Sequence, residues 1–566
     1  MSTRQKKIVE SKAYKEWEKS IKSNPLVYDQ EGKVFKTESG IPMKALYTPD
    51  DLDAIGFDYE KEVGYPGYFP NTRGIDPGMY RGSMVRLKQY VGYGSPEETN
   101  RLYKYLIAQG QNAISIAYDL PTQSGYDSDN PRVEGEVGKI GVPICSLKDW
   151  EVITDGIDLE KILVNSVCNA QASVAMAWHI ATAEKRGIKE KNLKGLVQND
   201  ILKEFIARGN YVFPPEPSMR LVADMIVYAA KNVPNYVPMY ICPYHVREAG
   251  SNAIQEIAFG LCNGIAYIEE ALKRGLNIDN IAPRITCLIT GRHRDFLEEI
   301  CKFRAIRRMW ARLMKERFGA KDPRSYRLSM WDYEGGIGFT PDQHEINMAR
   351  AAIAAMAGAL GGVQDIGLCT LDEALGTPSE KALTLALRTA QIVAFETGVT
   401  HTIDPLAGSY FIEYLTHELE TKANEYIKKV DELGGMVKAV EKGYPQREIL
   451  KSAYNYQMAE EKGERVVIAG NKFVSEKREK TRGFYRPQPK MVQKHIRNLK
   501  QMREERENGK VKTALANLKK AAEKPAGNEN NLMPPIIEAV KAYATVGEIM
   551  GALREIFGEY QEVTGL

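Results

Sequence analysis

Short apolar runs of strand length alternate with longer amphipathic runs from about residue 80 to about residue 420. Eight runs are rich in the β-branched and aromatic residues typical of strands: 82–94, 112–119, 162–169, 195–200, 237–245, 284–291, 327–333 and 362–370. Helical spacing fills the intervals, as in 96–110, 172–187, 218–232, 296–319 and 345–362. This alternation predicts an α/β fold, a (β/α)8 TIM barrel. A doubly wound open sheet is disfavoured because no G-x-G-x-x-G or Walker-type sequence follows the first strand.

The ends of the predicted strands supply candidate site residues, because a barrel of this kind carries its active site at the carboxyl ends of its strands. The candidates are Tyr90, Tyr118, Asp119, Gln198–Asp200, Tyr244, His245, Arg284, Thr286, Trp331–Glu334 and Gln364.

The segments that flank the barrel are helical in pattern. We expect residues 1–50 to form an N-terminal helical arm that makes subunit contacts, and residues 51–425 to form the barrel that binds substrate and catalyses. Residues 426–566 are predicted to be a helical C-terminal region and linker that docks a partner. This last region contains heavily charged helical stretches and ends in an amphipathic segment, which suits packing against a body or a partner.

Composition narrows the classes of function. The chain has 77 basic and 74 acidic residues, a balance that argues against nucleic-acid binding. No apolar stretch approaches the roughly 20 residues that span a membrane, and the amino terminus lacks the apolar core of a secretory signal. Seven cysteines without C-x-x-C spacing predict buried free thiols in a reducing cytoplasm, with no structural zinc site.

Three residues of the barrel have side chains suited to chemistry on a small acyl compound. His245, one of seven histidines, could give a proton or hydrogen bond to a carbonyl, because the reference pKa of imidazole lies near neutrality. Arg208 could hold a carboxylate with two nitrogens, and Tyr90 could supply a phenol and a flat wall. Residue type alone leaves structural alternatives open, namely a satisfied core histidine and a surface ion pair.

Several long strings resemble the methylmalonyl-CoA mutase family. They include "VQNDILKEFIARGNYVFPPEPSMRLVADMI", "YHVREAG", "IAPRIT", "TLDEALGTPSE" and "TIDPLAGSYFIEYLT", and the similarity runs in order from about residue 50 onward. The resemblance implies a barrel threaded by the pantetheine arm of coenzyme A, with adenosylcobalamin over one mouth. It also implies a radical rearrangement in which the CoA thioester group migrates to the neighbouring carbon.

The matched motifs also imply roles for single residues. His245 would hydrogen-bond the thioester carbonyl, Tyr244 would pack near the adenosyl group, and Tyr90 would help to displace that group. Arg208 would hold a free carboxylate, and Gln198 would contact the thioester.

The remaining predicted contacts complete the site. Coenzyme A contacts implied by the resemblance are Arg284 and Thr286, and strand-end position adds Tyr118, Trp331 and Tyr333 to the substrate contacts. Cofactor contacts are Glu248 and Glu373 by resemblance and Gln364 by position, and no metal ligand is predicted.

The cobalamin-binding domain of this family carries a D-x-H-x-x-G motif, and none of the seven histidines here lies in that setting. The chain is therefore interpreted as the large, substrate-binding subunit of an adenosylcobalamin-dependent acyl-CoA mutase that lacks the cobalamin-binding domain. It is expected to need a small cobalamin-binding subunit, in a heterotetramer or another oligomer.

The substrate is the less determined part. "RLSMWDYEGGIGFT" departs from the family pattern, and Cys242-Pro243 replaces a usual Ser-Gly pair. Retention of Arg208 and Tyr90 favours a malonyl- or succinyl-type dicarboxylic acyl-CoA, with alkyl- or aryl-substituted forms left open, because an unpaired buried guanidinium is costly. The alternatives are isobutyryl-CoA or 2-hydroxyisobutyryl-CoA as substrate, and a non-catalytic scaffold barrel. A metal-dependent hydrolase has no supporting ligand spacing.

Overall fold

The computed structural model describes residues 7–22, 35–476 and 487–561. Parts of the predicted N-terminal arm (1–6 and 23–34) and of the predicted C-terminal region (477–486 and 562–566) lie outside the described residues. Within the described part, no helix is both long and apolar enough to cross a membrane.

Ten short strands surround one axis, and every neighbouring pair is parallel. They are β1 (Arg86–Leu87), β2 (Tyr90–Val91), β3 (Ala113–Ala117), β4 (Leu163–Val167), β5 (Gly195–Val197), β6 (Tyr236–Val237), β7 (Met239–Ile241), β8 (Ile285–Gly291), β9 (Ser329–Glu334) and β10 (Asp365–Gly367). They form two five-stranded sheets, in the orders β1-β10-β9-β8-β7 and β2-β3-β4-β5-β6.

The two sheets join into a ring of eight strands. β1 and β2 are segments of one run interrupted at Lys88–Gln89, and β6 and β7 are segments of another interrupted at Pro238. Proline has no N–H to donate to a strand ladder, which accounts for the second break. Each interrupted run has one segment in each sheet, so these two runs join the two sheets into a closed order. All eight predicted strands are present, and the (β/α)8 barrel is confirmed.

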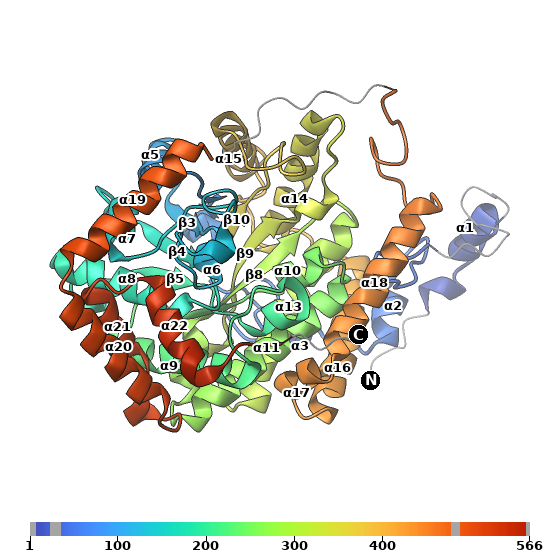
Figure 1. Ribbon diagram of the computed structural model, residues 1–566. Helices are drawn as coiled ribbons and strands as arrows, with labels where there is room; N and C mark the ends of the chain where they lie inside the picture. Colours follow the sequence, from blue (N-terminus) through green and yellow to red (C-terminus); the bar gives the residue numbers. More distant parts are fainter. Residues whose placement is uncertain (1–6, 23–34, 477–486, 562–566) are drawn as a thin grey trace.

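Helices alternate with the strands and extend beyond them (Figure 1). Before and within the barrel lie α1 (Lys12–Lys22), α2 (Pro49–Ala54), α3 (Tyr59–Glu62), α4 (Met79–Gly82), α5 (Pro96–Ala108), α6 (Leu120–Gln123), α7 (Leu147–Ile153), α8 (Ala172–Lys185), α9 (Pro215–Asn232), α10 (Pro243–Glu248), α11 (Ala253–Lys273), α12 (Ile278–Ile281), α13 (Phe296–Arg312), α14 (Asn347–Gly361) and α15 (Glu380–Phe395). After them come α16 (Tyr410–Glu432), α17 (Met436–Glu441), α18 (Tyr444–Glu461), α19 (Pro489–Glu505), α20 (Asn508–Ala522), α21 (Met533–Lys541) and α22 (Val546–Phe557).

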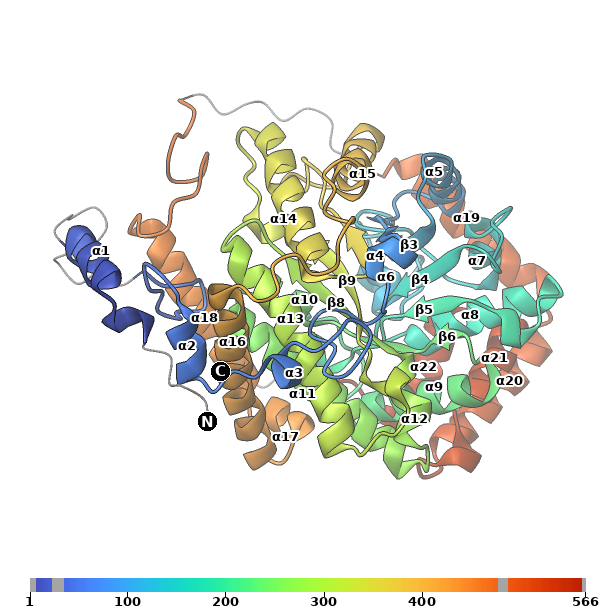
Figure 2. The same ribbon diagram turned by 180° about the vertical axis from the view of Figure 1, so that it is seen from behind.

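The helices after the barrel cover two different sides of it (Figures 1 and 2). α16–α18 lie on the side of α11 and α13, near the N-terminal α2, whereas α19–α22 lie over the half that contains β3–β5. Arg220 of α9 fastens the second group by donating to the carbonyls of Ala521, Ala522, Lys524 and Asn530. α16 runs through position 425, so the predicted limit of the barrel falls inside a helix.

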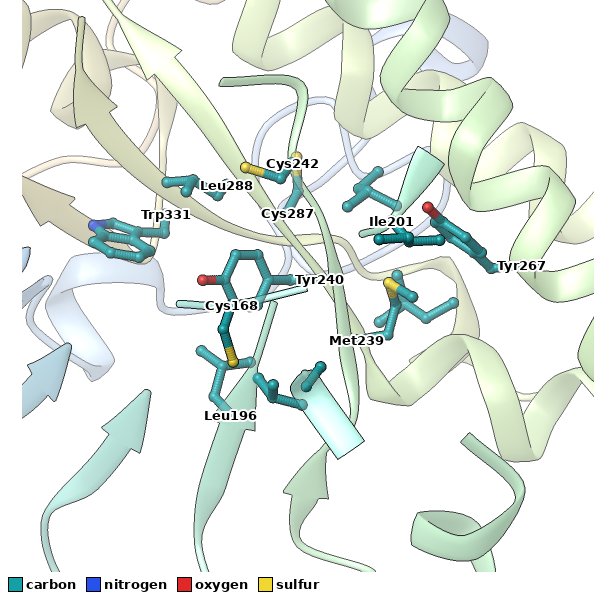
Figure 3. Close-up of a cluster of buried hydrophobic side chains, with 14 of the residues drawn as sticks. Cys168, Leu196, Ile201, Met239, Tyr240, Cys242, Tyr267, Cys287, Leu288 and Trp331 are labelled. Carbon is teal, nitrogen blue, oxygen red and sulfur yellow. The ribbon is translucent and has the colours of Figure 1, made fainter. Parts of the chain in front are cut away.

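Buried apolar side chains fill the barrel interior and the layer between strands and helices. Figure 3 shows part of this core, where Tyr240, Leu288 and Trp331 of neighbouring strands lie near Cys242. All seven cysteines are free and buried, as predicted.

A group of buried charges, here called the charge hub, connects α10 to both flanking regions. Its centre is Arg247, only 1 % exposed, which pairs with Glu38 (3.2 Å), Glu299 (3.3 Å) and Glu256 (3.5 Å). Lys302 lies 2.8 Å from Glu256 and 2.5 Å from Glu299, so cations and carboxylates alternate.

Glu38 carries the charge hub outward from α10. It comes from the segment before α2, and it also meets Arg292 (3.1 Å) and Arg465 (2.9 Å), the latter from beyond α18. Burial opposes its ionisation, yet Arg247, Arg292 and Arg465 hold the pKa of Glu38 well below its usual range. The N-terminal segment, the barrel and the C-terminal region therefore share one ion-pair network.

Replacing Arg247 by methionine should strongly destabilise the fold, because it leaves three buried carboxylates short of a partner. The expected loss in the free energy of unfolding is about 3–5 kcal/mol, measured by chemical denaturation of the purified chain. Arg324→Met is the matched control, since its side chain is 71 % exposed and pairs with Asp322, and it should cost less than about 1 kcal/mol. Equal losses for the two variants would contradict the importance of the charge hub.

Candidate active site

A cavity of about 670 Å³ opens at the carboxyl-terminal mouth of the barrel. Its lining comes from β2, from the segments after β5 and β10, from α10 and from β9. Eight of the residues singled out from the sequence line it: Tyr90, Gln198, Arg208, Tyr244, His245, Trp331, Tyr333 and Glu373. The structure thus gathers residues that are up to 283 positions apart, Tyr90 and Glu373, around one space.

Arg284, Thr286 and Gln364 lie at the opposite mouth. Arg284 directly precedes β8 and Thr286 is its second residue, so both mark the amino end of that strand and not its carboxyl end. Gln364 precedes β10, accepts from the backbone N–H of Met330 (2.9 Å) and donates to the carbonyl of Gly362 (3.0 Å). Polar residues on either side of a short apolar run look alike in sequence, which explains the misplacement of all three.

Tyr118 and Glu248 lie near the cavity without lining it. Tyr118 is fully buried, donates to Ser166 Oγ (3.0 Å) and stacks on Trp150, because alternation along β3 turns it to the face opposite to that of Ala117. Glu248 ends α10, and its Oε2 accepts from the backbone N–H of Ile337 (3.1 Å). Its Oε1 is buried and has no hydrogen-bond partner among the described residues.

Aromatic rings form the middle of the cavity wall, with Tyr333 at their centre. Its ring makes edge contacts with those of Tyr90 (6.4 Å between centroids), Tyr244 (5.8 Å) and Trp331 (5.5 Å). Trp331 and Tyr333 therefore both pack within the wall and face the cavity. Burial raises the pKa of Tyr90 to about 12, so its phenol keeps its proton at neutral pH.

Arg208 occupies one side of the cavity and is held by a buried carboxylate. It ends the short π-helix η4 (Glu204–Arg208), a type of turn that is frequent at functional sites. Its Nη1 lies 3.3 Å from Glu204 Oε1, and its Nη2 donates to Gln123 Oε1 (2.7 Å). Glu204 also pairs with the buried Lys203 (2.7 Å), so it serves two cations. With its side chain 22 % exposed, Arg208 remains accessible to an anion in the cavity.

His245 is a neutral imidazole at this site. Burial, and secondarily the positive charges of Lys203 and Arg208, lower its pKa well below the usual value. Its Nδ1 lies 3.2 Å from Cys242 Sγ, which also accepts a hydrogen bond from Gln198 Nε2 (3.1 Å). A neutral imidazole has one N–H, so it can donate a hydrogen bond to a carbonyl without bringing a charge into the cavity.

Carboxyl groups gather on the opposite side of the mouth. Desolvation at the cavity mouth, then the carboxyl groups of Glu248 and Asp372, raise the pKa of Glu373 to about 7, although the residue itself is exposed. The pKa of Glu334, fully buried behind them, is raised well above its usual value by burial and by neighbouring carboxyl groups. The mouth thus has a cationic side at Arg208 and an acidic side at Glu373, whose pKa is raised.

Candidate metal ligands lie elsewhere in the described part of the chain. One group of three, Cys145, Asp149 and His495, brings its ligand atoms within 4.8 Å of one another. His495 belongs to α19, and the three residues line no part of the cavity.

Sequence reasoning missed several residues that shape the site. Lys203 and Glu204 are charged neighbours of Arg208 in the chain, a signal that could have been weighed. Lys88 is 1 % exposed, and its Nζ lies 3.8 Å from both the centre of the Trp331 ring and Asp365 Oδ2. Burial lowers the pKa of Lys88 to about 8. That contact joins residues of different strands, and only the closed barrel reveals it.

Glu373→Gln should remove a pH-dependent part of the folding stability. The folded chain keeps this proton up to about pH 7 and the unfolded chain releases it near pH 4.5, so the stability falls as pH rises through that interval. The melting temperatures of variant and parent should agree near pH 4.5 and diverge in favour of the variant by about pH 8. Glu425→Gln, an exposed change on α16, is the control. Parallel curves for Glu373→Gln and its parent would show that Glu373 has an ordinary pKa.

Comparison with known proteins adds an independent line of information. Residues 36–559 match the protein family described as "Methylmalonyl-CoA mutase". The 2-hydroxyisobutanoyl-CoA mutase large subunit of Aquincola tertiaricarbonis is 41% identical over 93% of this chain and 93% of its own length. Methylmalonyl-CoA mutase of Rhizobium meliloti is 39% identical over 98% of this chain and 76% of its own length, and the human mitochondrial enzyme 37% over 96% and 72%. The matched region contains the whole barrel and every cavity residue described above. The chain belongs to the methylmalonyl-CoA mutase family.

Proposed function

We propose that this chain is the substrate-binding large subunit of an adenosylcobalamin-dependent mutase that acts on a dicarboxylic acyl-CoA. The observation that carries the proposal is the presence of Arg208 and His245 in the wall of one cavity, together with Tyr90, Tyr244 and Gln198. One cavity thus offers a guanidinium for a carboxylate and a neutral N–H for a carbonyl. A malonyl- or succinyl-type thioester contains both the carboxylate and the carbonyl.

The thioester end would lie at His245. Its neutral imidazole donates a hydrogen bond to the carbonyl oxygen, which polarises the group that migrates. Gln198 holds the same region from the neighbouring strand end. The coenzyme A tail would run along the barrel axis to the amino-terminal mouth, where Arg284 and Thr286 lie.

The carboxylate end would lie at Arg208. Glu204 neutralises one of the two cations that it contacts, Lys203 and Arg208, so an incoming carboxylate would complete the pairing. A guanidinium recognises a carboxylate through two parallel hydrogen bonds, a geometry that an ester of a monocarboxylic acid does not offer.

The acidic side of the mouth suits the polar edge of adenosylcobalamin. When bound, this cofactor supplies the radical that starts and ends the rearrangement. The buried and unpartnered Oε1 of Glu248 and the carboxyl group of Glu373, with its raised pKa, leave hydrogen-bonding capacity for ribose hydroxyls or amide groups. Tyr90, Tyr244 and Tyr333 line the cavity beside that side with aromatic rings.

The partner is proposed to be a small cobalamin-binding subunit. The relative from A. tertiaricarbonis is described as a large subunit, and this chain covers 93% of its length. The D-x-H-x-x-G motif that the family uses for cobalamin does not occur among the 566 residues of the sequence.

A second candidate substrate is 2-hydroxyisobutyryl-CoA. The identity of 41% to the mutase for the 2-hydroxyisobutanoyl ester favours it. Arg208 and Tyr90 favour the dicarboxylic substrate, because a tertiary alcohol does not need a guanidinium.

The proposal is tested by combining this chain with its small cobalamin-binding subunit and adenosylcobalamin. Methylmalonyl-, ethylmalonyl-, arylsuccinyl-, isobutyryl- and 2-hydroxyisobutyryl-CoA would be supplied separately, and isomer formation followed by mass spectrometry. Turnover of at least one dicarboxylic ester is the expected result. Isomerisation of monocarboxylic esters alone would transfer the assignment to the second candidate, and no isomerisation at all would favour a scaffold subunit.

Arg208→Met should lower kcat/KM for the dicarboxylic ester by about a hundredfold or more, because truncating one partner of a buried charge pair costs about 2–5 kcal/mol. The same change should leave binding of free coenzyme A within about twofold, since the tail does not reach this residue. Arg388→Met on the outside of α15 is the control, and equal losses in the two variants would argue against a carboxylate at Arg208.

A further inference from the structure

We propose that Cys242 is a positioning residue that fixes the tautomer of His245, so that the imidazole proton is on Nε2 and available to the substrate carbonyl. The inference rests on the proposed function for its catalytic meaning, but the tautomer itself can be measured without any substrate.

The thiol of Cys242 keeps its proton in the folded chain. Cys242 Sγ is fully buried at the N-terminus of α10, 3.2 Å from His245 Nδ1 and 3.1 Å from Gln198 Nε2. Burial raises the pKa of this thiol far above neutrality, so the sulfur keeps its proton at physiological pH. A protonated thiol has one S–H to donate and lone pairs to accept with.

Cys242 Sγ accepts one hydrogen bond, from Gln198, and donates another, to His245. The amide nitrogen of Gln198 can only donate to the sulfur. This orientation is set on the other side of the amide, where Gln198 Oε1 accepts from Asn169 Nδ2 (2.9 Å). Of these two polar neighbours of Sγ, His245 Nδ1 is therefore the one that can accept its proton. A neutral imidazole that accepts at Nδ1 carries its own hydrogen on Nε2.

The backbone at Cys242 is held in place by its neighbours. The backbone N–H of Cys242 donates to Asp200 Oδ2 (2.6 Å), and Asp200 in turn accepts from Tyr267 Oη (2.6 Å) and Asn263 Nδ2 (3.1 Å). Pro243 then begins α10 with a fixed backbone angle, so the backbone that carries the Cys242 side chain is held in place.

The contact between Cys242 and His245 is also the last link in a continuous series of hydrogen bonds across the cavity wall. Asn169 Nδ2 reaches both Gln198 Oε1 and Glu204 Oε1, and Glu204 holds Arg208. The order of the chain is Arg208, Glu204, Asn169, Gln198, Cys242 and His245. The group proposed to hold the carboxylate and the group proposed to hold the carbonyl are thereby oriented by one series of hydrogen bonds.

The direct test is nuclear magnetic resonance of the complete chain with isotope-labelled histidine. The nitrogen shifts distinguish a protonated from an unprotonated ring nitrogen, and His245→Gln identifies the signals of this residue. We expect an unprotonated Nδ1 and a protonated Nε2 in the parent. Cys242→Ala should shift His245 toward a mixture or toward the Nδ1-protonated form, while Cys242→Ser should restore the parent pattern. A protonated Nδ1 in the parent, or an unchanged pattern in Cys242→Ala, would overturn the proposal.

Kinetics with the small subunit and adenosylcobalamin supply the second readout. Cys242→Ala should lower kcat by about tenfold, the equivalent of one hydrogen bond, with KM changed by less than about twofold. Cys242→Ser should recover most of that loss, because a hydroxyl also donates to Nδ1. Cys262→Ala removes another fully buried thiol, on α11, and should leave the kinetics unchanged.

The proposed function and the positioning role of Cys242 can be disproved independently of each other. An absence of isomerase activity in the parent would remove the proposed function while leaving the tautomer measurement valid. A normal kcat in Cys242→Ala, in an active enzyme, would remove the positioning role and leave the proposed function intact.

Discussion

The structure depends on the buried pairing of Arg247 with three glutamates. Arg247 lies two positions after His245 on α10, so the network that neutralises its charge also fixes the short helix that carries Tyr244, His245 and Glu248. Buried charges tolerate little displacement, because a carboxylate that loses its partner in a low-dielectric interior becomes strongly unfavourable. The chain thus stiffens one wall of the cavity through a residue of α10, Arg247, that does not itself line the cavity.

The site combines a cationic side, a neutral donor and an acidic side within one aromatic enclosure. Lys203 and Arg208 share Glu204, His245 stays uncharged, and the pKa of Glu373 is raised to about 7. This arrangement suits a substrate with charge at one end and a polarisable carbonyl in the middle.

Much of this can be predicted from the sequence, for identifiable reasons. Strand and helix periods are local, so they locate all eight strands, and long motifs place Tyr90, His245 and Arg208 correctly in one cavity. The assignment of Arg284, Thr286 and Gln364 to the same mouth is wrong, because local pattern does not show whether a polar residue precedes or follows a short strand. The pairing of Lys203 with Glu204, the contact of Lys88 with Trp331 and the bond of Cys242 to His245 depend on side-chain geometry that no period encodes.

The interruptions at Lys88–Gln89 and at Pro238 have a mechanical consequence. Arg86–Leu87 bond to β10 and Tyr90–Val91 bond to β3, and a similar change of partner occurs between β6 and β7. The ring is therefore two half-shells that overlap along two seams, and one seam passes beside Tyr90 at the mouth. A small tilt of one half-shell against the other would widen this mouth while preserving the strand ladders within each half.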